Sequence, residues 1–361
     1  MNSRERFRAC LDRRRADRVP IDYLSHPRTD ENLRKFYGIG TEEELLDRLG
    51  CDFYYLSCRD ISQNESCLPF YKGPKLDFTE KERTCPFGIR WQRGVYRTKF
   101  ASDEVLGGPL AGATTPREIL RHRWPRVANF DFSPLVGEAE RHADRVIVGG
   151  LWTGLLGDSF RLHGFENFLY RMAAEPRIVH TLVNKVRDVY LEFNDHVFSL
   201  LKGRLDVWFF GSDFGSQSGL LFSANMLAEY FLEPIRELTA LARGYGLKVM
   251  MHSCGGIAEI IPLLLEAGIE ILDPVQTTAR GMDPSALKQR FGDRLVFHGG
   301  IDTQQVLPRG TLQEVRQHAL DMIRTLGRGG GYIFAPSQIL QGDVPVENID
   351  AMYRSAREHT Q

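Results

Sequence analysis

The chain has 361 residues, of which 42% are hydrophobic and 26% are charged, and its formal net charge is -1. This composition is ordinary for a soluble globular protein, and the near-neutral charge provides no basic field for nucleic acid or an anionic membrane. No apolar run approaches the length that crosses a bilayer. We therefore expect a protein that acts on a small molecule, with neither nucleic acid nor a membrane as its partner.

The N-terminal segment and the cysteines indicate a compartment. Residues 1–8 are charged and no apolar stretch follows them, so they do not resemble a secretory signal peptide. The six cysteines are scattered without a Cys-x-x-Cys pair, and a chain of this length needs no disulfides to fold. We expect a protein of the reducing cytoplasm.

The first sixty residues combine short helices and strands. Residues 3–13 predict an amphipathic helix, and residues 19–23 predict a first strand that carries Asp22. Thr41 followed by Glu44 has the capping-box pattern of a helix start. Residues 51–56 are apolar and aromatic, and predict a second strand.

Residues 60–130 differ in character from the rest. They are rich in proline, glycine, basic and aromatic residues, with irregular alternation. This pattern predicts an inserted β-hairpin or small antiparallel sheet followed by a loop. Such an insertion either covers the mouth of an active site or decorates an edge of the domain.

From about residue 145 strands and helices alternate regularly. Strands are expected at residues 145–150, 206–210, 248–251, 269–276, 294–300 and 331–336, and helices at residues 165–174, 176–201, 223–244, 257–267, 284–291, 311–326 and 346–357. This alternation indicates parallel βαβ units, and the early strands raise the count to seven or eight. Neither GxGxxG after the first strand nor GxxxxGK[ST] is present, so we expect a single-domain (β/α)₈ barrel over residues 1–361.

Polar side chains follow five successive strands at their C-terminal ends, where (β/α)₈ enzymes build their sites. In chain order they are Asp213, His252 and Cys254, Asp273 and Gln276, His298 and Asp302, and Ser337 and Gln338. Such clustering exceeds what chance would give and indicates a functional site. Asp213 and Asp302 are candidate carboxylates, although each is equally compatible with capping a loop or turn, and His298 fits a structural role better than a catalytic one.

His252 and Cys254 are the candidate metal ligands. In an extended chain, residues two apart point to the same side, so imidazole and thiolate would face one point, as Zn²⁺ requires. Gly255 and Gly256 allow the backbone to turn away directly afterwards. The pair supplies half of a tetrahedral site, and an incidental His beside a buried Cys is the alternative interpretation.

The motifs at these strand ends resemble those of the uroporphyrinogen decarboxylase superfamily. The resemblance is carried by His252-Ser-Cys-Gly-Gly, Leu272-Asp-Pro-Val-Gln, His298-Gly-Gly-Ile-Asp-Thr-Gln, Gly329-Gly-Gly-Tyr-Ile-Phe-Ala-Pro and Val344-Pro-Val-Glu-Asn-Ile, with Asp17-Arg-Val-Pro and Arg161-Leu-His-Gly-Phe-Glu-Asn fitting the same group. Within the superfamily, the sequence is most similar to the branch of cobalamin-dependent methyltransferases. The resemblance implies a (β/α)₈ barrel with its site at the strand ends.

The resemblance also implies a zinc site that lacks one ligand. Methyltransferases of that branch bind zinc through a His-x-Cys pair, matched by His252 and Cys254, and through a second Cys in the loop after the last strand. Here that loop reads Ala335-Pro-Ser-Gln, so Gln338 stands at or near the position of the second Cys. Either another residue completes the site, with Asp213 the nearest by topology, or the metal differs, or none binds.

Three functions are compatible with this resemblance. The first is a methyltransferase that moves a methyl group between a methylated corrinoid and a zinc-activated thiol or other small acceptor. Its catalytic residues would be Asp213 and Asp302, and its substrate-binding residues Gln276, His298, Gln304 and Gln338. The corrinoid would reside on a partner protein, because the sequence has no corrinoid-binding Asp-x-His-x-x-Gly motif.

The second function is a metal-free decarboxylase acting on a tetrapyrrole or smaller acid, in which Asp213 stabilises a cationic intermediate. The Arg-Gln-Ala-Gly-Arg signature of the tetrapyrrole decarboxylases is missing from the sequence, which weakens this alternative. The third function is a non-catalytic barrel that binds a ligand or partner.

Overall fold

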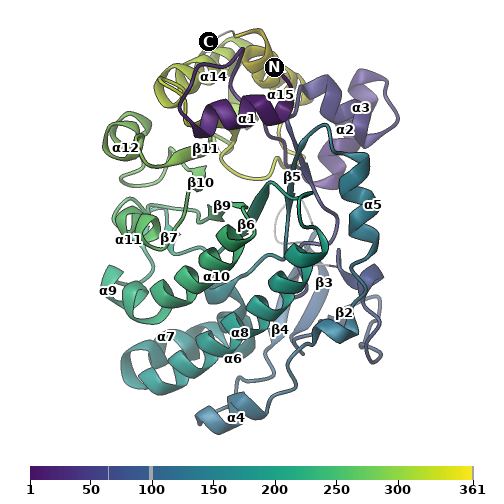
Figure 1. Cartoon of the computed structure of the whole chain (residues 1–361), viewed down its shortest axis with the longest axis vertical. Helices are drawn as coiled ribbons and strands as arrows, with labels where there is room; N and C mark the ends of the chain where they lie inside the picture. Colours follow the sequence, from purple (N-terminus) through teal and green to yellow (C-terminus); the bar gives the residue numbers. More distant parts are fainter. Residues whose placement is uncertain (64, 97–100, 360–361) are drawn as a thin grey trace.

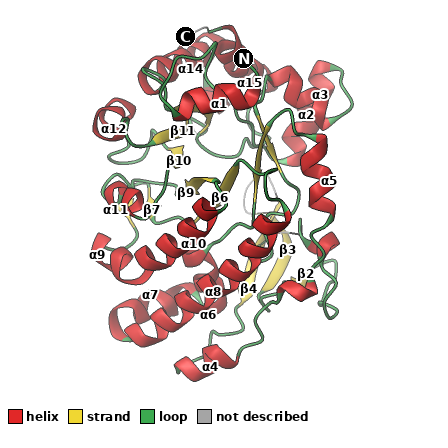
Figure 2. Ribbon diagram, viewed as in Figure 1, coloured by secondary structure: helices red, strands yellow, loops and turns green. Residues whose placement is uncertain are grey.

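A parallel sheet forms the centre of the molecule. The computed structural model describes residues 1–63, 65–96 and 101–359. Within these residues, seven parallel strands pair in chain order, and helices surround the sheet (Figures 1 and 2). The strands are β1 (Phe53–Tyr55), β5 (Val146–Gly149), β6 (Val207–Gly211), β9 (Lys248–His252), β10 (Ile271–Val275), β11 (Val296–Ile301) and β12 (Tyr332–Pro336).

The segment around Ile21 closes this sheet into a barrel. Ile21 forms a parallel bridge with Phe334 of β12, and the N–H of Asp22 donates to the carbonyl oxygen of Phe334 at 2.9 Å. On the other side, the N–H of Asp52 donates to the carbonyl oxygen of Ile21 at 2.8 Å. The segment forms an isolated bridge rather than the strand predicted for residues 19–23, because Pro20 has no N–H to extend the ladder. The predicted (β/α)₈ barrel is confirmed.

Helices lie on the outside of the barrel, and both chain ends lie near α14 and α15 (Figure 1). The helices of the described chain are α1 (Ser3–Leu11), α2 (Pro27–Tyr37), α3 (Glu42–Leu49), η1 (Leu68–Phe70), α4 (Pro116–Arg121), η2 (Val127–Asn129), α5 (Pro134–Arg141), α6 (Leu155–His163), α7 (Phe165–Ala174), α8 (Pro176–Leu200), α9 (Ala224–Leu227), η3 (Ala228–Leu232), α10 (Glu233–Gly244), α11 (Ile261–Glu266), α12 (Pro284–Phe291), α13 (Val306–Arg309), α14 (Leu312–Leu326) and α15 (Val346–Glu358).

The sequence patterns explain where most of these helices begin. The predicted capping box of Thr41 and Glu44 is present at the start of α3. The predicted helix 257–267 is shorter than expected, because α11 begins at Ile261 with Pro262 in its first turn, a position that proline favours. Helices α2, α4, α5, α6 and α13, and the short helices η1 and η2, were not predicted.

The expected insertion is a small antiparallel sheet of β2 (Glu82–Thr84), β3 (Arg90–Tyr96) and β4 (Ala101–Gly107). It lies beside α6, where the guanidinium of Arg161 stands over the ring of Trp91 at 5.8 Å. A further short hairpin, β7 (Gly215–Ser216) and β8 (Gly219–Leu220), follows β6. None of the described residues of the inserted sheet lines the cavity at the barrel mouth, whereas the loop before the sheet contributes Arg59, Asp60 and Gln63 to it.

Cys58 and Cys67 form a disulfide that bridges the loop before the inserted sheet. The expectation of reduced thiols is therefore wrong for this pair. A spacing of nine residues carries no recognisable signal in the sequence, and the turn that brings the two cysteines together is a property of the folded loop.

No helix in the described part of the chain combines the length and apolar character needed to span a membrane.

Candidate metal centre and active-site cavity

The register of the barrel strands brings the polar side chains of the strand ends together. His252 ends β9 and lies directly opposite Asp273 of β10, while Gly211 of β6 lies opposite His252 on the other side. His298 is on β11, the next strand after β10. Because neighbouring parallel strands in register present facing side chains on one side of the sheet, these groups converge at one point of the barrel mouth.

Three potential metal ligands meet at this point. The Nε2 atom of His252 lies 3.2 Å from Sγ of Cys254 and 3.4 Å from Oδ1 of Asp213. One ligand atom from each of the three residues lies within 4.8 Å of the others. The backbone N–H of Cys254 donates to Oδ1 of Asp213 at 2.9 Å, which ties the loop after β6 to the loop after β9.

Glycines permit this close approach of the two loops. A Cβ atom on Gly211 would lie 2.4 Å from the carbonyl oxygen of His252, and one on Gly255 would lie 2.5 Å from the carbonyl carbon of Gly215. Gly255 also has φ +89°, a conformation that other residues rarely adopt. Gly255 is therefore needed both for the turn after Cys254 and for the close packing of the ligand loops.

The donor set fits zinc. Imidazole nitrogen, thiolate and carboxylate oxygen are the three ligand types that Zn²⁺ accepts, and three protein ligands with a free fourth position are typical of catalytic sites. The Nδ1–H of His252 donates to Oδ2 of Asp273 at 2.5 Å, which leaves Nε2 directed at Cys254 and Asp213. A carboxylate behind the ligating imidazole is the common support for a zinc-binding histidine.

The electrostatics of the cluster favour a cation at Nε2 of His252. Burial by itself would lower the pKa of this imidazole, but the Asp273 and Asp213 carboxylates outweigh it and raise the pKa well above its ordinary value. Desolvation likewise opposes ionisation of Asp213, yet its contacts with His252 and the Cys254 N–H lower its pKa. Either a proton or a metal ion satisfies this arrangement.

Gln338 is next to the cluster but differs in role from a thiolate ligand. Its Nε2 donates to Sγ of Cys254 at 3.1 Å, while its Oε1 accepts from the N–H of Ile339 at 3.0 Å. An amide N–H directed at the sulfur supports a thiolate and does not coordinate a metal. Asp213 therefore supplies the third ligand type of the cluster, from the opposite side of the barrel.

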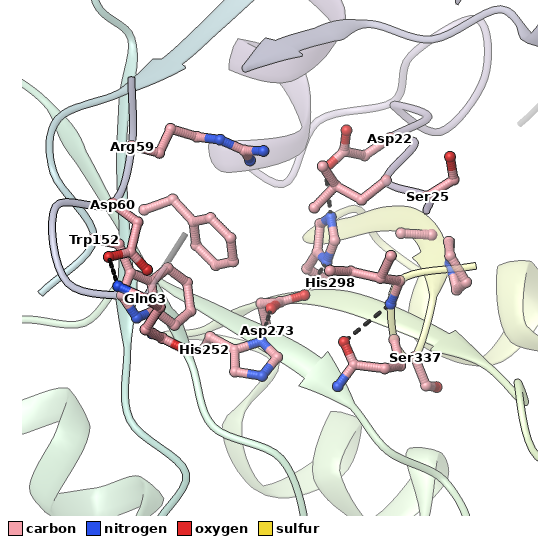
Figure 3. Close-up of a pocket in the computed structure, with 16 residues that line it drawn as sticks. Asp22, Ser25, Arg59, Asp60, Gln63, Trp152, His252, Asp273, His298 and Ser337 are labelled. Atoms are coloured by element: carbon pink, nitrogen blue, oxygen red, sulfur yellow. Dashed lines mark hydrogen bonds and ion pairs between the residues drawn. The ribbon is translucent and has the colours of Figure 1, made fainter. Parts of the chain in front are cut away.

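A cavity of about 300 Å³ opens beside the cluster. Its lining includes His252, His298 and Asp273 from the strand ends, and Trp152 and Phe209 as an aromatic wall (Figure 3). The ring centroids of Trp152 and His252 are 5.6 Å apart. The volume lies at the lower end of the range for small-molecule sites.

Arg59 projects into this cavity from the loop before the inserted sheet (Figure 3). Its guanidinium stands 5.0 Å from the ring centroid of Tyr55, and no carboxylate of the described chain forms an ion pair with it. A cation placed over an aromatic ring without an anionic partner is available to a ligand. Sequence inspection missed Arg59, because its importance depends on the path of the loop and not on any motif.

The remaining predicted site residues lie outside this cavity. Gln276 accepts from the N–H of Gly255 at 2.8 Å and so holds the ligand loop. Asp302 caps a turn through the N–H groups of Gln304 and Gln305, at 2.7 and 3.1 Å, which is the capping role considered for it from the sequence. The exposed Gln304 accepts from Gln217 and Thr278, at 3.1 Å each.

A (β/α)₈ barrel that gathers metal-competent and acidic side chains beside a cavity at its strand ends has the architecture of a barrel enzyme. Within that class, the chain belongs to the uroporphyrinogen decarboxylase (URO-D) family, whose model matches residues 141–359.

Proteins with this fold and family have been described from several organisms. Uroporphyrinogen decarboxylase of Psychromonas ingrahamii is 24% identical over 183 residues, which are 50% of this chain and 49% of that protein. The enzyme of the same name from Coxiella burnetii is 21% identical over 190 residues, or 51% of this chain and 48% of its own. The chain thus spans about half the length of the curated relatives it matches.

Among solved structures, a methyltransferase from Methanosarcina mazei superposes with a TM-score of 0.66 and 17% sequence identity. The match covers 99% of both chains. At this level of identity the similarity establishes the barrel fold over the whole chain.

Proposed function

We propose that the protein is a zinc-dependent methyltransferase that moves a methyl group between a methylated corrinoid, carried on a partner protein, and a thiol or other small acceptor. The observation that carries the proposal is the convergence of His252, Cys254 and Asp213 at the mouth of the barrel. Membership of the URO-D family and the shared fold with a protein described as a methyltransferase support it.

The chain's own residues prepare the site for this chemistry. His252, Cys254 and Asp213 would hold the zinc, while Asp273 orients the imidazole and Gln276 holds the N–H of the ligand loop. When bound, zinc would lower the pKa of an acceptor thiol and keep it as the nucleophilic thiolate at neutral pH. The Asp213 side chain is 58% exposed, so the cluster is accessible from the outside.

The cavity supports a small acceptor. Arg59 would bind an anionic group of that acceptor, and the rings of Trp152 and Phe209 would exclude water from one side. His298 and Gln338 also line the cavity and are proposed substrate contacts. Asp302 and the exposed Gln304 lie outside the cavity, so the catalytic role expected for Asp302 and the substrate contact expected for Gln304 find no support in its lining.

The names of the curated relatives favour a second candidate, a decarboxylase. The composition of the cavity argues against a polyacidic tetrapyrrole as its substrate. Three carboxylates line the cavity, from Asp22, Asp60 and Asp273, and Arg59 is the one arginine or lysine among its described lining residues. A substrate with several carboxylates would find a single guanidinium to pair with among these residues, and its remaining negative charges would be left unpaired, which disfavours binding.

Metal analysis of purified protein tests the proposal. Inductively coupled plasma mass spectrometry should find roughly one zinc per chain, the stoichiometry of a single three-ligand site. The variants His252→Ala, Cys254→Ala and Asp213→Ala should lose it. The matched controls His180→Ala, Cys85→Ala and Asp343→Ala remove the same side chains elsewhere and should retain it.

Activity then separates the two candidates. Zinc-loaded protein should demethylate methylcobalamin in the presence of small thiols, measured by the change in corrinoid absorbance, and the three ligand variants should not. Wild-type protein that takes up no metal from metal-replete buffer would refute the proposal. Metal-free decarboxylation that is lost in Asp213→Ala would establish the decarboxylase instead.

A further inference from the structure

A row of alternating carboxylates and imidazoles runs from the closing segment of the barrel to the candidate metal centre (Figure 3). Asp22 Oδ2 is 2.8 Å from His298 Nε2, His298 Nδ1 is 2.6 Å from Asp273 Oδ1, and Asp273 Oδ2 is 2.5 Å from His252 Nδ1. Asp22, His298 and Asp273 are 1%, 3% and 6% exposed. Burial strengthens each of these contacts and makes an unpaired member costly.

The partners of His298 determine its protonation. Both ring nitrogens face carboxylate oxygens, and ionised carboxylates can only accept hydrogen bonds. Asp22 also accepts from the hydroxyl of Tyr55 at 2.6 Å and from the N–H of Tyr23 at 2.7 Å. His298 must therefore donate from both nitrogens, and it is a buried imidazolium between two carboxylates.

The shared carboxylate of Asp273 connects this cation to the metal centre. One of its oxygens accepts from His298 and the other from His252, so Asp273 cannot rotate without breaking one of the two bonds. The positive charge of His298 also offsets the negative charge of Asp273. These bonds hold the His252 ring through Nδ1, with Nε2 directed at Cys254 and Asp213.

We propose that the Asp22–His298 pair is a positioning device for the metal centre, which locks Asp273 so that Asp273 fixes the ring orientation of His252. This inference rests on the proposed zinc site and adds two residues that act on it from a distance. Asp22 lies on the segment that closes the barrel, so closure of the fold and assembly of the metal centre depend on the same few residues.

Two substitutions at one position separate the two contacts of His298. The amide nitrogen of asparagine stands close to the position of Nδ1, so His298→Asn can still donate to Asp273. The longer side chain of glutamine places its amide nitrogen near Nε2, so His298→Gln can donate to Asp22 but not to Asp273. His163→Gln is the matched control, because His163 is 0% exposed and its Nδ1 bonds the carbonyl oxygen of Leu110.

The measurement is the zinc dissociation constant of the full chain, obtained by competition with a chromophoric chelator, with the Tm recorded for each variant. Loss of the group directly behind a metal ligand typically weakens metal binding by about 10–100-fold. His298→Gln leaves that group, Asp273, in place but removes its support, so we expect a loss at the lower end of this range, roughly 10-fold. His298→Asn should be affected less. His163→Gln should lower the Tm and leave zinc binding unchanged. If His298 had a merely structural role, His298→Gln would give this same result.

Two further readouts complete the test. The absorption spectrum of the Co²⁺-substituted protein should change in His298→Gln and not in His163→Gln. Nitrogen-15 NMR of the metal-free wild type should show protons on both ring nitrogens of His298. A neutral His298, or a His298→Gln variant that binds zinc as tightly as wild type, overturns the inference. Failure of the proposed function looks different, because wild-type protein itself would then take up no zinc.

Discussion

Replacing Asp52 with alanine should destabilise the barrel at its closing segment. Asp52 is 1% exposed and stands just before β1. Its carboxylate accepts from Arg6 Nη1 at 2.5 Å, from Arg18 Nη1 at 2.7 Å and from the backbone N–H of Ile21 at 2.8 Å. The substitution removes the common partner of two guanidinium groups and of the segment that joins β12 to β1.

The loss of stability in Asp52→Ala depends on which contacts Arg6, Arg18 and the N–H of Ile21 keep after the substitution. Breaking a buried ion pair by removing one partner costs about 3–5 kcal/mol, and an unpaired buried backbone donor costs about 1–3 kcal/mol. Arg6 keeps Asp17 at 2.7 Å, and Arg18 keeps the carbonyl oxygens of Val19 and Gly50. Because these contacts reduce the loss, we expect Asp52→Ala to lower the free energy of unfolding by about 3–5 kcal/mol in total.

Urea unfolding followed by circular dichroism measures this loss. Asp12→Ala is the matched control, because the Asp12–Arg14 ion pair is exposed, and such pairs contribute about 0–1 kcal/mol. Equal unfolding free energies for Asp52→Ala and Asp12→Ala would show that the closing segment is held by apolar packing and not by this carboxylate.

Three more substitutions test the cavity, the ligand set and the N-terminal ion pairs. Arg59→Ala should raise KM roughly 10-fold or more for an anionic acceptor, since a hydrogen bond to a charged group contributes about 1.5–3 kcal/mol; paired kinetics with a neutral acceptor should show no such rise. Adding Gln338→Cys to the Asp213→Ala variant should restore its zinc uptake, because position 338 borders Cys254 and thiolate is a good zinc ligand. Metal analysis that finds no zinc in this double variant would contradict the placement of position 338 beside the metal centre.

The Arg6 guanidinium holds the pKa of Asp17 well below its usual range. The Asp17 carboxylate therefore stabilises the folded state above about pH 4, and this contribution is lost as the pH falls. Asp17→Asn should therefore lower the Tm at neutral pH and have little effect in strong acid, and a pH-independent difference would refute the assignment.

The barrel was predictable because each βαβ unit has a local signal. Apolar runs of strand length alternate with helical periodicity from β5 to α15, and the capping boxes mark helix starts. The closing segment around Ile21 was harder to classify. Its hydrogen bonds go to Phe334 and Asp52, which are distant in sequence, and Pro20 weakens its local strand character. Contacts of that kind leave no periodic pattern.

The residues of the proposed metal centre also differ in how far the sequence predicts them. His252 and Cys254 were visible because residues two apart in a strand share a face, a purely local rule. The arrangement of Asp213, Asp273 and Asp22 around them depends on strand register, which pairs Asp273 with His252 across β10 and β9. Register is set by the packing of the whole barrel. The sequence therefore placed Asp213 and Asp273 at strand ends, and Asp22 within the expected first strand, without showing which atoms they face.

In the proposed site, Asp213 would stand in for a second thiolate, which preserves the charge of the ligand set and moves one ligand to another part of the barrel mouth. His252, Cys254 and Asp213 provide one thiolate and one carboxylate, the same formal charge as one imidazole with two thiolates. Asp213 follows β6, whereas Gln338 follows β12 and lines the cavity. The side of Cys254 next to the cavity is therefore occupied by a neutral amide and not by an anionic ligand. An acceptor thiol that entered past Arg59 would meet the proposed metal centre from that side without facing a second fixed thiolate.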